Sequence, residues 1–274
     1  MLELDYFGAD GCPLFAWSTA PLDGPGDHQR PVLVMMHGGG PDHRSLIPLA
    51  RLLSNEAILV LPDVRGYGQS RCRDAKRHTW QQYADDVVSL LEHINVQHAV
   101  IGGAGLGTTI SLRTAATYPE RIAGLVLISV EEIEDDEAKA AEIAFLDAFA
   151  ERVRTGGVEA GWRPILPDLS PIVGTMVREA MQDADPASVT AAAAIGRDRA
   201  FRTIEELLVI EAPTLLFAGA DSRHPAALAC NLAQLLPRGR LGKASMSEDL
   251  RTTEAFAQAF APEIGAFLRQ VCRA

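Results

Sequence analysis

Short apolar runs alternate with amphipathic segments along most of this chain. The apolar runs are the length of strands, and the stretch "PVLVMMH" is typical of a strand buried on both faces. The first 19 residues alternate around Ala9, Asp10 and Gly11, which predicts a hairpin. The remaining strands are predicted at 31–37, 57–63, 98–103, 121–129 and 213–219, with a short one near 239–245.

Apolar positions at helical spacing fill most of the gaps between these strands. The predicted helices lie at 44–54, 79–94, 106–117, near 225–236 and at 252–271. Strand–helix alternation of this kind predicts an α/β fold, with a mainly parallel eight-stranded sheet covered by helices on both faces. Ligands in such sheets bind at the carboxyl ends of the strands. We therefore expect the functional residues within 37–45, 63–70, 103–108, 129–134, 219–225 and 244–250.

The pattern changes over residues 131–210. An acidic start, "EEIEDDE", leads into segments of helical periodicity that Pro164, Pro167, Pro171 and Pro186 interrupt, and no stretch has the pattern of a strand. We interpret 131–210 as a helical cap inserted into a core domain made of 1–130 and 211–274.

Composition narrows the range of partners. The chain has 274 residues, of which 47% are hydrophobic, and its formal net charge is -11. This charge argues against nucleic acid and anionic membrane surfaces as partners. We see neither a signal peptide nor a membrane span, and the four cysteines are scattered without metal-ligand spacing. The expectation is a cytoplasmic protein, alone or as a homodimer, that binds a small molecule and needs no cofactor or metal.

Three motifs, in this order, carry a family resemblance. They are "HGGGPDHRS" at 37–45, "LPDVRGYGQS" at 61–70, and "GGAGLG" at 102–107 followed by "YPERIAGLVLIS" at 118–129. Together they resemble the oxyanion loop, the D-x-R-G-x-G-x-S turn and the nucleophile elbow of the α/β-hydrolase superfamily. The resemblance covers nearly the whole chain and implies the fold of that family.

The same resemblance implies a Ser, an acid and a His in that chain order, and the sequence departs from this pattern. Gly105 stands where the nucleophilic serine belongs. The acid position corresponds to Asp221 or Ser222, and the position expected for the histidine falls near Met246, with no histidine after His224. We therefore expect no acyl-enzyme chemistry.

Backbone donors survive the loss of the serine. The N–H of Leu106 would begin a helix opposite the loop of Gly38, Gly39 and Gly40, and such donors can polarise a carbonyl or hold an enolate. Gly105 would leave space above the turn for a ligand. The expected ligand-binding residues are Gly38, Gly39, Gly40, Ala104, Gly105, Leu106, Trp162, Asp221, Ser222, His224 and Met246.

Several side chains could move protons at this edge of the sheet. His43 is the first candidate, because imidazole titrates near neutrality, with Asp42 beside it. His37 fits a structural role in the loop as well as a catalytic one. Glu131 and Glu132 follow the fourth strand and could act as acid or base under an apolar cap, or could simply begin a solvated helix.

Three functions remain open. The first is a non-hydrolytic enzyme that cyclises, isomerises or eliminates on a carbonyl-bearing molecule, using backbone donors and acid–base residues. The second is a non-catalytic ligand carrier, sensor or partner protein. The third is a hydrolase in which a histidine or glutamate activates water.

Overall fold

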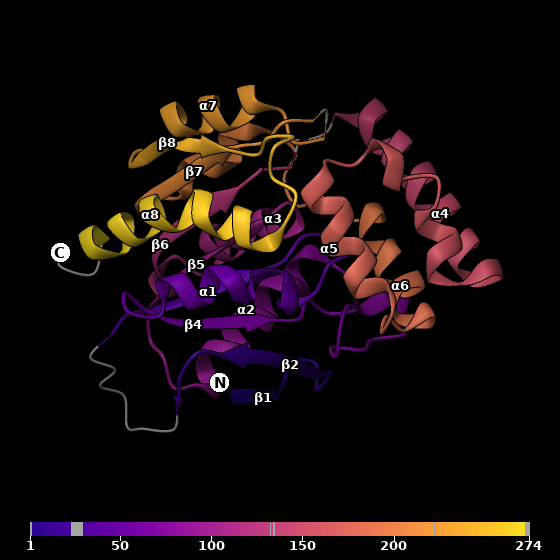
Figure 1. The fold of residues 1–274 in the computed structure, drawn as a ribbon, viewed down its shortest axis with the longest axis horizontal. Helices are drawn as coiled ribbons and strands as arrows, with labels where there is room; N and C mark the ends of the chain where they lie inside the picture. Colours follow the sequence, from indigo (N-terminus) through magenta and orange to yellow (C-terminus); the bar gives the residue numbers. More distant parts are fainter. Residues whose placement is uncertain (1, 23–29, 132, 134, 222, 272–274) are drawn as a thin grey trace.

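The computed structural model describes residues 2–22, 30–131, 133, 135–221 and 223–271. Its centre is an eight-stranded sheet in the order β1-β2-β4-β3-β5-β6-β7-β8 (Figure 1). The strands are β1 (Leu2–Phe7), β2 (Pro13–Ser18), β3 (Val32–Met36), β4 (Ile58–Pro62), β5 (Ala99–Ala104), β6 (Ile122–Ile128), β7 (Thr214–Ala218) and β8 (Gly239–Ser245). Strands β1 and β2 pair antiparallel and β2 pairs antiparallel with β4, whereas every pairing from β4 to β8 is parallel. The predicted mainly parallel sheet is confirmed.

Helices cover both faces of the sheet. Helices α1 (Ile47–Leu53) and α8 (Thr253–Val271) pack on one face, and α2 (Trp80–His93), α3 (Leu106–Thr117) and α7 (Ala226–Leu235) pack on the other. The strands between these two layers are almost wholly buried: all five residues of β3 and all five of β4 are buried. Burial on both faces is why these strands appear in the sequence as continuous apolar runs.

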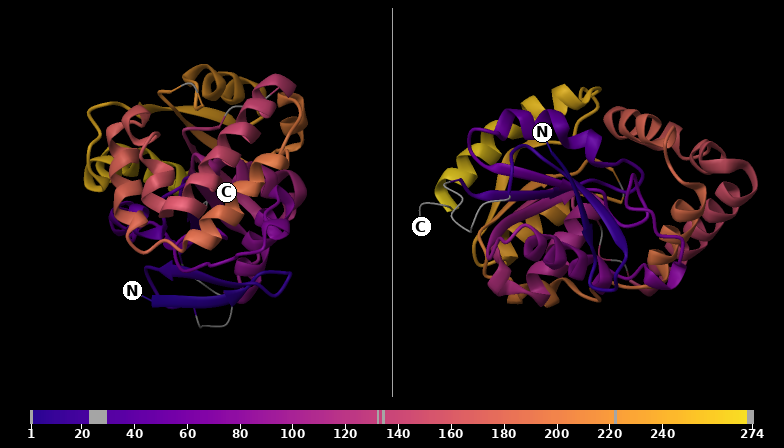
Figure 2. Two further views of the ribbon diagram at one scale, coloured as in Figure 1. Left: turned by 90° about the vertical axis from the view of Figure 1, so that its right-hand side faces the viewer. Right: turned by 90° about the horizontal axis from the view of Figure 1, so that it is seen from below.

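A helical insertion separates β6 from β7. It contains α4 (Asp136–Trp162), α5 (Pro171–Met181) and α6 (Pro186–Ala192), with shorter turns between and after them. These helices gather at one end of the sheet, beyond the carboxyl ends of the parallel strands (Figure 2). A small apolar cluster that includes Phe149, Val153 and Val189 joins α4 to α6. The cap thus has packing of its own over the carboxyl edge of the sheet.

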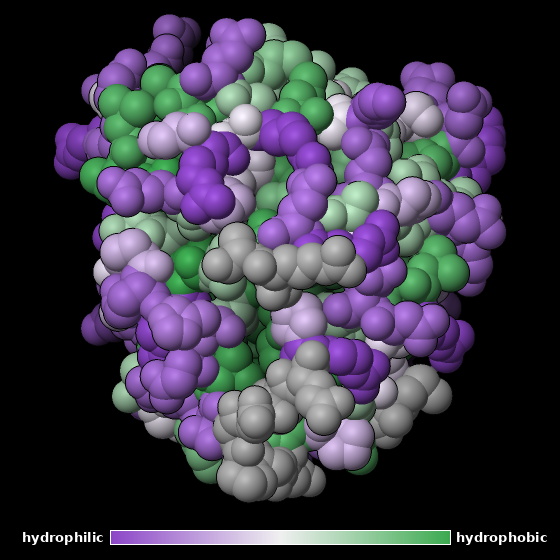
Figure 3. Space-filling model, turned by 90° about the vertical axis from the view of Figure 1, so that its left-hand side faces the viewer, coloured by the Kyte–Doolittle hydropathy of each residue, from purple (hydrophilic) through white to green (hydrophobic). Residues whose placement is uncertain are grey.

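The face opposite the cap has a mixed surface. Figure 3 views the molecule from that side, where hydrophobic residues occur in separate patches between hydrophilic ones. Within the described residues, no helix is both long and apolar enough to cross a membrane.

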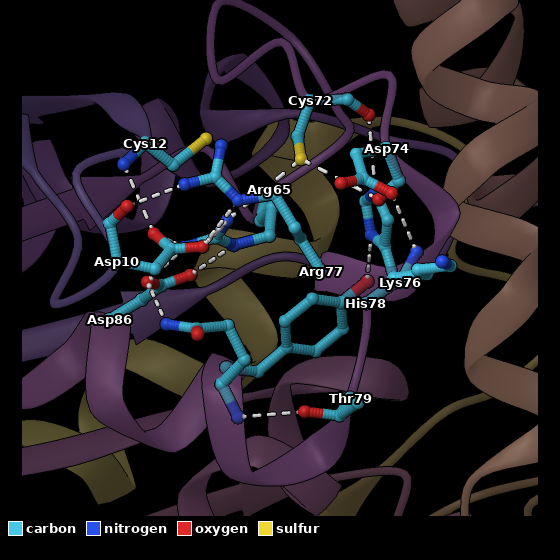
Figure 4. Close-up of polar contacts among 12 residues, drawn as sticks. Asp10, Cys12, Arg65, Cys72, Asp74, Lys76, Arg77, His78, Thr79 and Asp86 are labelled. Carbon is cyan, nitrogen blue, oxygen red and sulfur yellow. Dashed lines mark hydrogen bonds and ion pairs between the residues drawn. The ribbon is translucent and has the colours of Figure 1, made fainter.

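A buried ionic network fixes the turn after β4. The Arg65 side chain is fully buried and donates two hydrogen bonds to Asp86, at 2.6 and 2.8 Å, and two to Asp10, each at 2.9 Å (Figure 4). These contacts join the β1–β2 turn, the loop after β4 and helix α2. Burial raises the pKa of Asp86 and the Arg65 charge opposes that rise, so the carboxylate depends on its partner.

Candidate active site

The turn between β5 and α3 has the backbone of a nucleophile elbow. Gly105 has φ 51° and ψ -118°, a conformation in which any other residue would be strained. Leu106 is the first residue of α3, so its N–H has no acceptor within the helix. The glycine therefore relieves the strain of the turn while the backbone donor stays in place.

The imidazole of His224 faces this turn. A Cβ built on Gly105 would lie 3.3 Å from His224 Nε2. His224 follows β7, three residues after Asp221, and its Nδ1 donates to Asp221 Oδ1 at 2.8 Å. The Asp221 oxygen also accepts the backbone N–H groups of Arg223 and His224, each at 3.0 Å. Because the carboxylate holds the proton on Nδ1, Nε2 presents a lone pair toward the space above Gly105.

The acid of this pair is held ionised. The hydrogen bond from His224, helped by the two backbone donors, lowers the pKa of Asp221 below its usual value. A carboxylate oriented in this way fixes the tautomer of the imidazole and stabilises the imidazolium that proton uptake would form. The arrangement supplies two members of a catalytic triad from a single loop, with glycine in place of the third.

Sequence reasoning placed His224 and Asp221 among the ligand-binding residues and sought the base elsewhere. The position after β8, where the family resemblance puts its histidine, holds Met246, which is buried and lines the pocket. The available signal was the spacing Asp221-x-x-His224 directly after a buried strand. An exposed tight turn can also have this spacing, so the spacing alone does not identify His224 as a base.

The pocket above the elbow is mainly apolar. It has a volume of about 180 Å³, and the loop glycines Gly38 and Gly39 form one wall next to the elbow. The Cα of Gly38 lies 3.9 Å from the Cβ position of Gly105, so the loop approaches the elbow closely. Of the expected ligand-binding residues, those that line the pocket are Gly38, Gly39, Ala104, Gly105, Leu106, Trp162, Asp221, His224 and Met246.

Two expected ligand-binding residues do not appear in this wall. Gly40 packs against the indole of Trp162, which itself contacts Phe149 edge-to-face at 5.1 Å between ring centroids, so Gly40 lies behind the cap residue. Ser222 lies outside the described residues, as does Glu132 among the proton-transfer candidates.

His43 was the first candidate for proton transfer, and the structure places it elsewhere. It is buried, packs on Phe15, and is not among the residues that line the pocket. Its Nδ1 and its backbone N–H both bond to Asp63 Oδ1, each at 2.8 Å. The ring ties the loop after β3 to the loop after β4 and lies outside the pocket lining, and the catalytic role expected of His43 stays a prediction.

His37 and Asp42 are occupied in the same structural way. His37 Nδ1 donates to the Gly38 carbonyl at 2.8 Å, and its Nε2 accepts the Val64 N–H at 2.9 Å. Burial lowers the pKa of His37, which keeps the ring neutral. Burial opposes ionisation of Asp42, but hydrogen bonds from Arg44 outweigh it and lower the pKa. Neither residue lines the pocket, and their expected catalytic roles stay predictions.

The cluster of Asp42, His43 and Asp63 has the residue types of a cation site. Oxygen and nitrogen atoms of Asp42, His43 and Asp63 lie within 4.8 Å of one another. The oxygens already accept hydrogen bonds, including Gln69 N–H on Asp63 and the guanidinium of Arg44 on Asp42. These side chains therefore hold the loops together with bonds that a metal ion would have to displace.

Glu131 is the proton-transfer candidate that does reach the pocket. Its Oε2 accepts the hydroxyl of Thr109 at 2.8 Å, which holds the carboxylate against α3. Burial and the Glu131 charge raise the pKa of the neighbouring Tyr67 to about 12, so that phenol stays protonated. Glu131 is placed to bind a polar group or accept a proton at the rim.

Ser129 lies in the range 129–134 that was expected to hold functional residues, but the sequence assigned it no role. It follows β6, lines the pocket and has φ 63°, although it is not a glycine. Strained backbone of this kind clusters at functional sites. Its Oγ lies near the backbone of His224, since both approach the Cβ position of Gly219 within 2.8 Å. Nothing in the local sequence distinguishes it from the other residues that end strands.

Comparison with known proteins agrees with this geometry. A family model described as alpha/beta hydrolase fold matches residues 31–158. The chain has the α/β-hydrolase fold. A thermophilic esterase from Thermogutta terrifontis superimposes with a TM-score of 0.78 at 23% identity, over 99% of each chain. The bottromycin epimerase BotH superimposes with a TM-score of 0.69 at 21% identity, again over 99% of each chain.

Similarity in sequence extends over shorter regions. The magnesium-chelatase 30 kDa subunit of Rhodobacter capsulatus is 32% identical over 116 residues, which is 41% of this chain and 39% of that protein. The chain spans less than half the length of the curated relatives it matches. These likenesses show the fold, which the esterase and the epimerase share.

Proposed function

We propose that this chain is a non-hydrolytic enzyme that moves a proton on the carbon next to a carbonyl of a small, mainly apolar molecule. One observation carries the proposal. His224 Nε2, oriented by Asp221, faces the space that Gly105 leaves beside the Leu106 N–H. A base and an oxyanion donor thus flank one position, and no nucleophile lies between them.

The chemistry follows from these two groups. The substrate carbonyl oxygen accepts the N–H of Leu106 and an N–H of the Gly38–Gly39 loop. Nε2 takes the proton from the neighbouring carbon, and the electron pair of that C–H bond moves to the oxygen as an enolate. The imidazolium then returns the proton to the same carbon or to another. Epimerisation, isomerisation, elimination and cyclisation all begin with this step.

The apolar pocket favours this step over hydrolysis. A buried site with few polar groups excludes water and strengthens the hydrogen bonds to the enolate. An epimerase is among the proteins with a similar fold, so the architecture accommodates such chemistry without implying it here.

Solvent isotope exchange tests the proposal. The protein is incubated with apolar ketones and thioesters in D₂O, and their mass is followed. We expect a gain of one deuterium at the α-carbon that His224→Gln abolishes. The exposed histidine His98 provides the matched control, so His98→Gln should leave the exchange unchanged.

Hydrolysis is the second candidate, because the space above Gly105 also has room for a water molecule that His224 could activate. Turnover in H₂¹⁸O separates the two reactions. Incorporation of ¹⁸O into a product acid without deuterium exchange overturns the proposed proton transfer. Tight binding with neither reaction would assign the pocket to a ligand-binding protein instead.

A further inference from the structure

A second, charged cavity lies beside the apolar pocket. It has a volume of about 70 Å³ and is formed between α3, the first turns of α4 and the segment 199–201. Glu131 and Arg223 line both cavities, so they mark the boundary between them. Arg223 directly precedes His224 in the chain, which places this boundary next to the proposed base.

The described residues of its lining carry more positive than negative charge. Lys139, Arg199 and Arg223 face Glu131 and Glu142. Glu142 already accepts Lys139 at 2.7 Å and Arg223 at 3.3 Å. Arg199 pairs at 2.9 Å with Asp136, whose side chain is 98% exposed, so solvent weakens this pair. Among the three cations of the lining, Arg199 is therefore the one with the weakest ion pair.

Buried donors point to the same ligand chemistry. Trp80 lines the cavity, is 7% exposed, and its indole Nε1 has no hydrogen-bond partner among the described residues. Behind this wall, Arg113 donates to the carbonyl of Ala200, another lining residue, and its Nε is likewise without a partner in the described chain. A buried donor without an acceptor costs free energy, and an anion in the cavity would offer an acceptor to the Trp80 N–H.

We infer that this cavity binds the carboxylate end of the substrate whose carbonyl lies at the elbow. This inference rests on the proposed function and narrows its substrate class to a carbonyl compound with an apolar body and a terminal carboxylate. Arg199 and the Trp80 N–H would hold the carboxylate, because guanidinium and indole donors satisfy its oxygens. The apolar body would fill the larger pocket between them.

Binding measurements test the inference without requiring turnover. The probes are straight-chain methyl ketones of six to eight carbons that end in a carboxylate, each compared with its uncharged methyl ester by calorimetry. We expect at least one acid to bind about tenfold more tightly than its ester, the scale of one charge-assisted hydrogen bond. Arg199→Gln should remove most of this preference, and Trp80→Phe should reduce it.

The matched control is Arg197→Gln. Arg197 lies two residues from Arg199 and pairs with Asp147 on the surface, outside the cavity lining. It should keep the preference, although the net charge of the protein changes equally. Equal binding of acid and ester, or tighter binding of a ketone that ends in trimethylammonium, overturns the inference. A preference for the acid without deuterium exchange would leave the inference standing and contradict only the proposed reaction.

Discussion

Two polar regions lie at the same edge of the sheet. They differ in how many of their polar atoms have hydrogen-bond partners inside the protein. Around Arg65 and Asp63, buried charges are paired and the carboxylate oxygens accept hydrogen bonds (Figure 4). Around Gly105, a helix N–H and the Nε2 of His224 face an apolar cavity. The first region has its partners inside the protein, whereas the second presents its polar atoms to a ligand. Polar residues that share an edge of the sheet can therefore serve stability or chemistry, according to where their partners are.

Replacing His224 should produce the largest effect on activity. His224→Gln removes the base, and general-base catalysis contributes about 10²- to 10⁴-fold to rate, so deuterium exchange should fall by that factor. The half-exposed pair with Asp221 contributes little to folding, and the free energy of unfolding should change by less than about 0.5 kcal/mol. Deuterium exchange rates measure the loss of activity, and urea denaturation of the same sample measures the free energy of unfolding. A large loss of stability would mean that His224 also supports the fold, which contradicts the contrast with the region around Arg65.

Replacing Arg65 should show the opposite pattern. Arg65→Met leaves Asp86 buried without its cation, and breaking a buried pair costs about 3–5 kcal/mol of stability. Urea denaturation should detect this loss, and the variant may be compared with Arg73→Met, whose pair with Asp185 is at the surface. Equal effects of the two substitutions would contradict the structural role of the buried network.

The buried histidines predict a fall in stability under mild acid. Burial lowers the pKa of His78 to about 4, while Tyr83 and the Cys72 carbonyl accommodate its neutral form. In the unfolded chain, His78 takes up a proton near pH 6.5. The stability that the folded protein gains from the neutral ring is therefore complete above pH 6.5 and is lost as pH falls toward 4. The difference between the His78 pKa in the unfolded and in the folded chain corresponds to about 3 kcal/mol of the free energy of unfolding. His37, whose pKa is also lowered, adds to the loss in the same direction.

Denaturation at a series of pH values checks this prediction. His78→Gln should flatten the dependence between pH 6.5 and 4, although it lowers stability at neutral pH. An unchanged slope in that variant would show that other groups control the transition.

Restoring a hydroxyl at the elbow gives the sharpest test of the site geometry. In Gly105→Ser the new Cβ would lie 3.3 Å from His224 Nε2, and we expect labelling by a serine-directed phosphonate that the parent protein lacks. The positive φ should cost about 1–3 kcal/mol of stability. Gly105→Ala bears the same strain without a hydroxyl and should stay unlabelled. Absence of labelling in a folded Gly105→Ser protein would show that His224 is not oriented as a base.

The fold could be predicted from the sequence because its signals are local. The predicted strand 239–245 coincides with β8, and the predicted helix 106–117 coincides with α3. The predicted helix 44–54 differs, since it begins as a 3₁₀ turn at His43–Leu46 and becomes α-helical only at Ile47. Asp42 accepts the Arg44 N–H at the start of this turn, a local bond that periodicity does not reveal.

The sequence by itself determined that the elbow lacks a nucleophile, because a glycine has no side chain in any fold. Only the tertiary structure decided which histidine faces that glycine. His37 and His43 follow a strand as His224 does, but the first two are bonded to neighbouring loops and only His224 directs a ring nitrogen toward Gly105. The physical reason is that a residue's chemistry is set by the partners of its polar atoms, and these partners come from segments far apart in the chain.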